Sequence, residues 1–191
     1  MVVKFNLIAA CCENMGIGKN GDLPWRLKNE MAHFTNMTTK TQDKCKKNVV
    51  ILGRTSWDCI PEKYKPLVDR INFVLSTKKL DLSQYKDTYA FSSWDEIVNK
   101  LKDSEFRQRY EDVWVCGGSK IYEDAMDSKY FYRLYLTRIK KDFECDTFFP
   151  KLVIDNIQRI SDLRVPQGVQ EEKGIKWEVE VWENTKVPIL N

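Results

Sequence analysis

Residues 16–25 read Gly16-Ile17-Gly18-Lys19-Asn20-Gly21-Asp22-Leu23-Pro24-Trp25, and they follow an apolar, strand-like run from Val2 to Cys12. The first six letters fit G-x-G-x-x-G, a dinucleotide-binding pattern that requires a helix to begin at the glycines. Pro24 opposes such a helix, because a proline pushes the residue before it toward an extended conformation. The glycines therefore predict a loop with a different purpose from a helix N-terminus that holds a pyrophosphate.

Outward from this stretch, short apolar runs alternate with helix-like segments. The expected strands are 3–10, 48–52, 70–76, 112–116, 133–139 and 177–182, and the expected helices are 27–39, 56–60, 94–101 and 119–126. Ser93 and Glu96 have capping-box spacing, which marks one helix start. This alternation predicts an α/β domain with a mainly parallel sheet covered on both faces. Residues 170–175 read as a polar turn before the last strand, which we expect to be antiparallel.

The length, composition, net charge and cysteine spacing exclude several classes of protein. The 191 residues are 42% hydrophobic and 31% charged, with a net charge of +3, as in an ordinary soluble globule. No run approaches the roughly 18 apolar residues of a membrane span, and no secretory signal begins the chain, so we expect a cytoplasmic protein. A dense basic stripe for nucleic acid is missing. Six cysteines without C-x-x-C spacing and the single histidine, His33, predict reduced structural thiols and no metal site.

Glu30 is the most informative ionisable residue. On a helical wheel of 27–39 it falls among the apolar side chains, which are Leu27, Met31, Phe34 and Met37. A carboxylate on such a face is costly unless it is paired or hydrogen-bonded. It is therefore either an ion pair or cap, or a desolvated group that binds a cationic or amide-like ligand edge, with a pKa raised toward neutrality. His33 lies at the edge of this face and is interpreted as a boundary residue.

Two strand-to-helix turns carry glycine with hydroxyl and cationic residues. Gly53-Arg54-Thr55-Ser56 follows one strand, and Cys116-Gly117-Gly118-Ser119-Lys120-Ile121-Tyr122 follows another. Together they favour a ligand with extended phosphates, such as a dinucleotide. Helix capping and close strand–helix packing are the plain alternatives. Arg70, after Pro66-Leu67, is suited either to a bidentate grip on a carboxylate or to a surface salt bridge.

Taken in order, these pieces resemble dihydrofolate reductase from Asn6 to about Trp182, most closely the animal-type monofunctional enzyme. The matching blocks are Gly16-Ile17-Gly18 with Leu23-Pro24-Trp25, Gly53-Arg54 with Trp57, Ile60-Pro61-Glu62-Lys63, Pro66-Leu67 with Arg70-Ile71-Asn72, Gly117-Gly118 with Tyr122, and Thr137-Arg138-Ile139 leading into Asp146-Thr147-Phe148-Phe149-Pro150. Each block alone is weak, but their shared order is specific. The resemblance implies one α/β domain over 1–191, with a mostly parallel eight-stranded sheet, an antiparallel C-terminal strand and helices on both faces.

The resemblance also implies an activity, the reduction of 7,8-dihydrofolate to 5,6,7,8-tetrahydrofolate for one-carbon metabolism. Hydride would pass to pteridine C6, and N5 would be protonated. The implied catalytic residues are Glu30, Leu23, Trp25 and Thr137; Glu30 would bind the pteridine N3 and 2-amino group, and Thr137 would support it. Arg70 would hold the glutamate α-carboxylate. The implied substrate contacts are Ile8, Ala10, Glu30, Met31, Phe34, Thr35, Ser56, Ile60, Tyr64, Pro66, Leu67, Arg70 and Thr137.

The implied cofactor is NADPH, and the family has a cis peptide at the position of Gly117-Gly118. Met31 stands where an aromatic residue is usual in the family. Thr55 and Thr77 stand where basic residues are expected, which leaves Arg54 or Lys78 as the cation for the adenosine 2′-phosphate. The implied cofactor contacts are Ala10, Gly16, Ile17, Gly18, Lys19, Asn20, Gly21, Asp22, Leu23, Gly53, Arg54, Thr55, Ser56, Leu75, Ser76, Thr77, Lys78, Ser93, Cys116, Gly117, Gly118, Ser119, Lys120, Ile121 and Tyr122.

Residues 16–25 would then form a mobile loop over the nicotinamide and the pteridine. The expected partners are dihydrofolate and antifolate inhibitors, with no membrane or nucleic acid, and the expected state is a monomer. The rival hypotheses are another nicotinamide-dependent reductase of Rossmann type, which Pro24 opposes, and a non-catalytic ligand-binding protein on the same fold. A nucleic-acid-binding module comes last.

Overall fold

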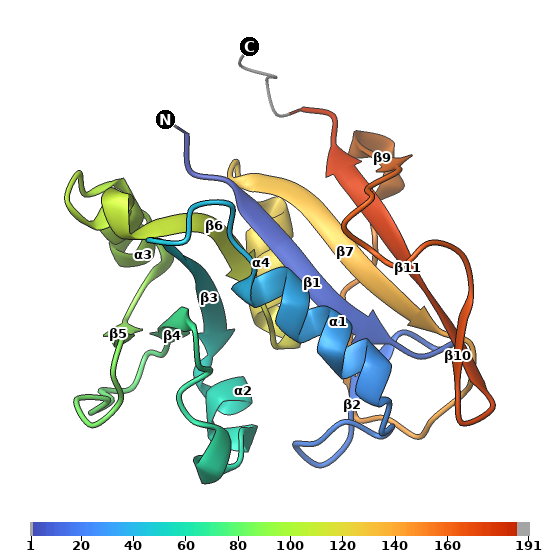
Figure 1. The fold of residues 1–191 in the computed structure, drawn as a ribbon. Helices are drawn as coiled ribbons and strands as arrows, with labels where there is room; N and C mark the ends of the chain where they lie inside the picture. The colour runs from blue at the N-terminus through green and yellow to red at the C-terminus, as the bar shows by residue number, and fades with distance from the viewer. Residues whose placement is uncertain (1, 187–191) are drawn as a thin grey trace.

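A twisted nine-stranded sheet runs through the centre of the molecule, and the structure, a computed structural model, describes residues 2–186 (Figure 1). Eight strands form one path in the order β10-β11-β7-β1-β6-β3-β4-β5, and β9 pairs with β11 beyond this path. The strands are β1 (Phe5–Cys11), β3 (Lys47–Gly53), β4 (Arg70–Leu75), β5 (Thr88–Phe91), β6 (Tyr110–Val115), β7 (Phe131–Ile139), β9 (Ile157–Ile160), β10 (Gln170–Glu172) and β11 (Ile175–Asn184).

The sheet is parallel from β7 to β5 and antiparallel at its C-terminal end. There, β11 runs antiparallel to β7, β9 and β10. Lys173 and Gly174, with φ of 52° and 72°, form the two-residue turn between β10 and β11. The predicted antiparallel last strand is confirmed. The segment 170–175, predicted only as a turn, also contains strand β10.

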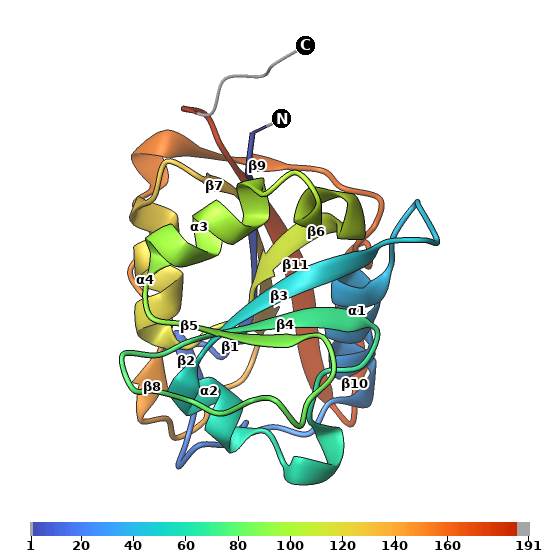
Figure 2. The same ribbon diagram turned by 90° about the vertical axis from the view of Figure 1, so that its left-hand side faces the viewer.

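Helices cover both faces of the sheet, as predicted. Figure 2 shows α1 on one side and α3 and α4 on the other. The helices are α1 (Lys28–Thr39), α2 (Arg54–Cys59), α3 (Trp94–Lys102) and α4 (Ser119–Asp127), with short 3-10 helices at Glu62–Tyr64, Phe106–Arg109 and Ile154–Asn156. The predicted helix start is confirmed, since the Ser93 hydroxyl oxygen accepts from the Glu96 N–H at 3.2 Å, while the Glu96 carboxylate accepts from the N–H of Ser92 at 2.7 Å. Among the described residues, no helix combines the length and the apolar character that a bilayer crossing needs.

Strand β1 shows how the sheet divides the core. Phe5 and Leu7 point toward α3 and α4 and belong to the larger buried cluster, with Ile97 and Ala125. Ile8 points to the opposite face and packs in a second cluster with Met37 of α1 and Trp57 of α2. The alternation follows from the two-residue period of a strand buried on both faces. Ile8 of β1 therefore faces the same side of the sheet as α1, the helix that carries Glu30.

Candidate active site

The residues predicted for the site gather at one edge of the sheet. Strands β1, β3, β4 and β6 are parallel and end together, so the loops that follow them meet where ligands bind in open α/β sheets. The turns after β3 and β6 touch, because the Gly53 N–H donates to the Gly117 carbonyl at 2.8 Å. A Cβ on Gly118 would lie 3.1 Å from the Ser56 hydroxyl. The two glycine turns therefore form one surface.

Glu30 lies on the buried side of α1 with only 5% of its surface exposed. Burial raises the pKa of its carboxyl to about 7, a hydrogen bond with Thr137 lowers it in part, and the charge of Glu172 raises it further. Both Glu172 oxygens accept from the start of α1, from the N–H groups of Lys28 and Asn29 at 2.8 Å. The carboxyl is therefore desolvated, held by one hydroxyl, and able to change charge near neutral pH.

Two predictions about the buried face of α1 are wrong. Met31, predicted among the apolar core positions, is 44% exposed, and His33, predicted as a boundary residue, is only 6% exposed. The buried stripe is Glu30, His33, Met37 and Thr38. It is rotated toward His33 because the His33 ring packs against Trp177 of β11, with ring centroids 6.5 Å apart. Burial lowers the pKa of His33 to about 4, so the imidazole is neutral.

Arg70 is buried near the other end of α1, where it is 6% exposed. Its Nη1 donates to the Thr38 hydroxyl at 2.9 Å, and its Nε donates to the Val68 carbonyl at 3.0 Å. No carboxylate pairs with Arg70 within residues 2–186, so the surface salt bridge considered from the sequence is wrong. Burial lowers the pKa of this guanidinium. Thr38 lies eight residues after Glu30, about 12 Å along the helix axis.

Between these two ends lie most of the predicted substrate contacts. Ile8 is buried and Ala10 is half-buried on β1, while Phe34 on α1 and Ile60 and Leu67 across from it pack against the same apolar cluster as Ile8. The backbone N–H of Leu67 donates to Asn72 Oδ1 at 3.0 Å, which fixes the corner after Pro66. Thr35 is exposed, and Tyr64 is 59% exposed beneath the Lys63 ammonium.

Residues 16–25 form a hairpin and no helix, as Pro24 predicted. β2 (Gly16–Gly18) pairs with β8 (Thr147–Phe148), and Lys19 and Asp22 exchange two backbone hydrogen bonds of 2.9 and 3.0 Å. Asn20 and Gly21 form the tip, with φ of 50° and 76°. A Cβ on Gly21 would lie 2.9 Å from the Cys59 sulfur at the end of α2. The tip therefore approaches the opposite side of the site.

The far end of this segment is anchored in the core, which places its last residues beside the site. Trp25 is 3% exposed and packs on Phe143, with ring centroids 5.6 Å apart. Leu23 packs against the same cluster. The N–H of the Trp25 indole is buried and makes no hydrogen bond within the described residues.

The turn after β6 has the geometry that the resemblance implies. The Gly117-Gly118 peptide is cis, and Gly117 has a φ of 111°. A Cβ on Gly117 would lie 3.2 Å from the Tyr122 ring, and the Tyr122 hydroxyl donates to the Ile8 carbonyl at 2.8 Å. Ser119 and Ile121, at the start of α4, and Cys116 before the glycines are half-buried. The backbone at this turn is thus fixed between β1 and α4.

Two of the predicted phosphate-binding cations are paired with carboxylates. Arg54 contacts Asp58 at 2.6 Å, and Lys120 contacts Glu123 and Asp124 at 2.9 and 3.0 Å. Lys78 is exposed and makes no ion pair in the described chain; its N–H donates to the Ser76 hydroxyl at 3.0 Å. Beside it Thr77 is exposed and Leu75 is half-buried; Thr55 is exposed on α2.

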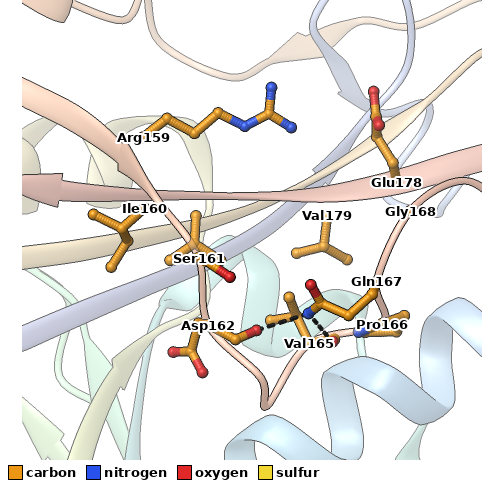
Figure 3. A pocket seen from close by; sticks show the side chains of 11 residues that line it. Arg159, Ile160, Ser161, Asp162, Val165, Pro166, Gln167, Gly168, Glu178 and Val179 are labelled. Atoms are coloured by element: carbon orange, nitrogen blue, oxygen red, sulfur yellow. Dashed lines mark hydrogen bonds between the residues drawn. The ribbon is translucent and has the colours of Figure 1, made fainter.

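A separate cavity of about 250 Å³ lies between β9, β11 and the loop before β10 (Figure 3). The Gln167 amide spans this loop, donating to the carbonyls of Asp162 and Val165 at 2.9 and 2.8 Å. None of the predicted site residues lines this cavity. It is therefore distinct from the edge where the glycine turns meet.

Comparison with known proteins agrees with this geometry. A family model described as dihydrofolate reductase matches residues 4–183. The chain is 46% identical to the dihydrofolate reductase of Sus scrofa over 93% of this chain and 96% of the relative, and 44% identical to that of Heliothis virescens over 94% and 97%. The structure of Schistosoma mansoni dihydrofolate reductase superposes with a TM-score of 0.84 and 32% identity, covering 96% of this chain and all of that one.

The chain belongs to the dihydrofolate reductase family. The resemblance inferred from the ordered blocks is confirmed, and so is the α/β fold that it implied. Within this dihydrofolate reductase fold, sequence reasoning missed Thr38 and Glu172, which hold Arg70 and the start of α1. Thr38 could have been found as the residue one turn after Phe34, on the apolar face of the helical wheel. Glu172 had no local signal, because 143 or more residues separate it from its partners.

Proposed function

We propose that this protein reduces 7,8-dihydrofolate to 5,6,7,8-tetrahydrofolate with NADPH and so supplies one-carbon metabolism. Membership of the dihydrofolate reductase family makes it an oxidoreductase that acts on dihydrofolate. The observation that carries the finer proposal is Glu30, a carboxyl buried on α1 beside Thr137 with a pKa of about 7. An ionised Glu30 accepts two hydrogen bonds from the N3–H and 2-amino group of the pteridine, and Thr137 keeps its orientation.

The other end of the substrate is assigned to Arg70. Its guanidinium keeps its charge and is already oriented by Thr38 and Val68, so it binds the glutamate α-carboxylate with little loss of side-chain entropy. Ile8, Phe34 and Leu67 supply apolar surface for the rings between the two charged ends. This arrangement fixes both ends of the elongated dihydrofolate anion and leaves its pteridine ring over β1.

Protonation at N5 is assigned to water. A Glu30 carboxylate that binds N3 and the 2-amino group is on the far side of the pteridine ring from N5. Leu23 and Trp25, at the anchored end of the hairpin, limit the access of bulk water to the reacting rings. Glu30 thus holds the substrate and sets its electrostatic environment, while a single water molecule delivers the proton.

The residues at the glycine turns fit an extended dinucleotide. Gly117 has a φ of 111°, which side chains rarely adopt, and a Cβ there would be crowded by the Tyr122 ring at 3.2 Å, so this turn favours glycine. NADPH, when bound, supplies the hydride from the nicotinamide C4. Ala10, the hairpin and Gly117–Ile121 would hold its nicotinamide half, and Ser76 to Lys78 with Arg54 its adenosine half. Lys78 is the better candidate for the 2′-phosphate, because Arg54 is paired with Asp58.

The decisive test is NADPH oxidation by the purified protein with and without dihydrofolate. We expect a signal that depends on dihydrofolate and is at least about tenfold weaker with NADH. Glu30→Gln should lower kcat/KM by about 10²–10³-fold, because a charge-assisted pair of hydrogen bonds to the pteridine is lost. Glu171→Gln is the matched control, since Glu171 is exposed on β10 and should leave the rate unchanged.

Two outcomes would contradict this assignment. Folded protein that binds dihydrofolate without oxidising NADPH would support the non-catalytic binding protein instead. Full activity of Glu30→Gln at neutral pH, with an unchanged pH–rate profile, would show that the catalytic role belongs to another residue. The remaining proposals, a monomer in the cytoplasm that binds antifolates at this site, are tested by light scattering, by imaging of a tagged chain and by competition with dihydrofolate.

A further inference from the structure

Two thiols from distant parts of the chain meet at the base of the hairpin. Cys12 directly follows β1 and Cys145 lies two residues before β8, and their sulfurs are 3.7 Å apart. The two residues are separated by 133 positions. We propose that Cys12 and Cys145 form a redox modification site, a dithiol that a small disulfide oxidant such as oxidised glutathione converts to an intramolecular disulfide. Side-chain rotation must bring the sulfurs from 3.7 Å to about 2.05 Å.

The environments of the two sulfurs determine which cysteine reacts first with the oxidant. Cys12 is fully buried, and its thiol hydrogen bonds to Asn14 Oδ1 at 2.9 Å; Cys145 is half-buried and reachable from solvent. The Cys145 thiolate attacks the oxidant, forming a mixed disulfide and releasing one thiolate. Cys12 then loses its proton and attacks the Cys145 sulfur, which releases the second thiol. Two electrons pass from the cysteine pair to the oxidant, and no other reactant is needed.

The remaining cysteines lack this arrangement. Cys11 points to the opposite face of β1, where its sulfur lies 3.9 Å from the Met15 sulfur. Cys45 and Cys59 are exposed, and Cys116 contacts the Trp114 carbonyl. Within the described residues, only Cys12 and Cys145 have their sulfurs within contact distance of each other. The pair is therefore the selective target in a protein with six thiols.

The reaction should be slow at neutral pH. Burial, followed by the neighbouring Cys12 thiol, raises the pKa of Cys145 to about 11, so little thiolate is present. The rate of the first step, the attack of Cys145 on the oxidant, should therefore rise about tenfold for each pH unit in the range below that pKa. This pH dependence distinguishes the pair from a cysteine with a lowered pKa, which is already a thiolate at neutral pH.

The disulfide would fix the hairpin of residues 16–25 at its base. Asp146, next to Cys145, donates its N–H to the Gly18 carbonyl at 3.0 Å, and its side chain accepts from the Asn20 N–H at 2.7 Å. A Cβ on Gly16 would lie 2.6 Å from the Cβ of Cys145, so β2 packs directly on this residue. Oxidation therefore joins the end of β1 to the segment that holds the hairpin.

The test is incubation of the full-length protein with oxidised glutathione at pH 8, followed by peptide mapping without reduction. We expect a mass loss of two hydrogens, one peptide pair joined through Cys12 and Cys145, and a rise in Tm of about 5–10 °C that dithiothreitol reverses. Cys12→Ser and Cys145→Ser should abolish the link and the shift. Cys45→Ser is the control, because Cys45 is exposed and has no thiol neighbour, and it should behave like the wild type.

The mapping is decisive on the wild-type protein, so it does not depend on how well a variant folds. A stable glutathione adduct on Cys145, a link between other cysteines, or six free thiols after oxidation at pH 9 would each overturn the proposal. None of these readouts uses dihydrofolate or NADPH. The outcome is therefore independent of the proposed activity.

Discussion

The two ends of helix α1 hold buried groups of opposite charge, and they respond differently to burial. Near its start, Glu30 is 5% exposed and contacts Thr137; near its end, Thr38 accepts from Arg70, which is 6% exposed. Burial disfavours the charged form of both groups. It brings the pKa of Glu30 to about 7, whereas a guanidinium stays protonated in a protein even when its pKa falls.

The site therefore has one anchor that titrates near neutrality and one that is permanently charged. At the Arg70 end, the guanidinium donates hydrogen bonds to two oxygens that are already in place, Thr38 Oγ1 and the Val68 carbonyl. The Glu30 end keeps one hydroxyl partner and a nearby like charge, Glu172. An ionised Glu30 thus costs folding free energy that a ligand can recover by donating hydrogen bonds to it. The charge of Arg70 is better compensated by its protein partners than that of Glu30.

The largest expected effect comes from removing the charge at the Glu30 end. The folded-state pKa of about 7 lies above the ordinary value of 4.5, so the stability that the protonated carboxyl contributes is fully present below pH 4.5 and is lost as the pH rises through 7. Glu30→Gln cannot ionise and avoids this loss, so it should be more stable than the wild type at pH 8 by about 3 kcal/mol. Urea unfolding at pH 4 and pH 8 measures the difference.

At pH 4 the two proteins should have nearly equal free energies of unfolding, because the wild-type carboxyl is then protonated in both states. An equal difference at both pH values would mean that the substitution acts through packing. Glu171→Gln serves again as the control, since Glu171 is exposed and should show no such pH dependence.

A smaller effect is expected at the Arg70 end. Arg70→Lys keeps the charge but loses the planar fork that binds a carboxylate through two hydrogen bonds, so KM for dihydrofolate should rise about 10–50-fold with kcat changed less than about threefold. A pteridine substrate without the glutamate should show no change in KM. Arg159→Lys, on exposed β9, is the matched control. A large fall in kcat would contradict the view that this end only anchors the substrate.

The sequence predicted the Glu30 end better than the Arg70 end, for a physical reason. A helical wheel detects a carboxylate on an apolar stripe from a single segment. The burial of Arg70 depends on its contact with Thr38 of α1, which lies 32 residues away in the sequence. The same limit explains Met31 and His33, since the stripe of α1 is set by Trp177, which is distant in the sequence.

Long strands could be predicted from the sequence, and short ones could not. The long apolar runs of β1, β3 and β7 were predicted to within a few residues, whereas β5, β9 and β10 have three or four residues and no buried residue among them. Their pairing depends on a neighbouring strand and leaves little trace in their own composition. The hairpin at 16–25 is the opposite case, because one proline was enough to exclude a helix.

The smallest expected effect concerns the like charge beside the Glu30 end. Glu172 accepts from the N–H groups of Lys28 and Asn29 and raises the pKa of Glu30 through its charge. Glu172→Gln keeps an acceptor at the helix start and removes the charge, so the pKa of Glu30 should fall by about half a unit or less. Carboxyl NMR titration of Glu30 measures this shift, and Glu171→Gln, one residue away and exposed, should leave the pKa in place. A Glu30 pKa that stays the same in Glu172→Gln would assign the whole shift to burial, and the two ends of α1 would then differ only in the chemistry of their own side chains.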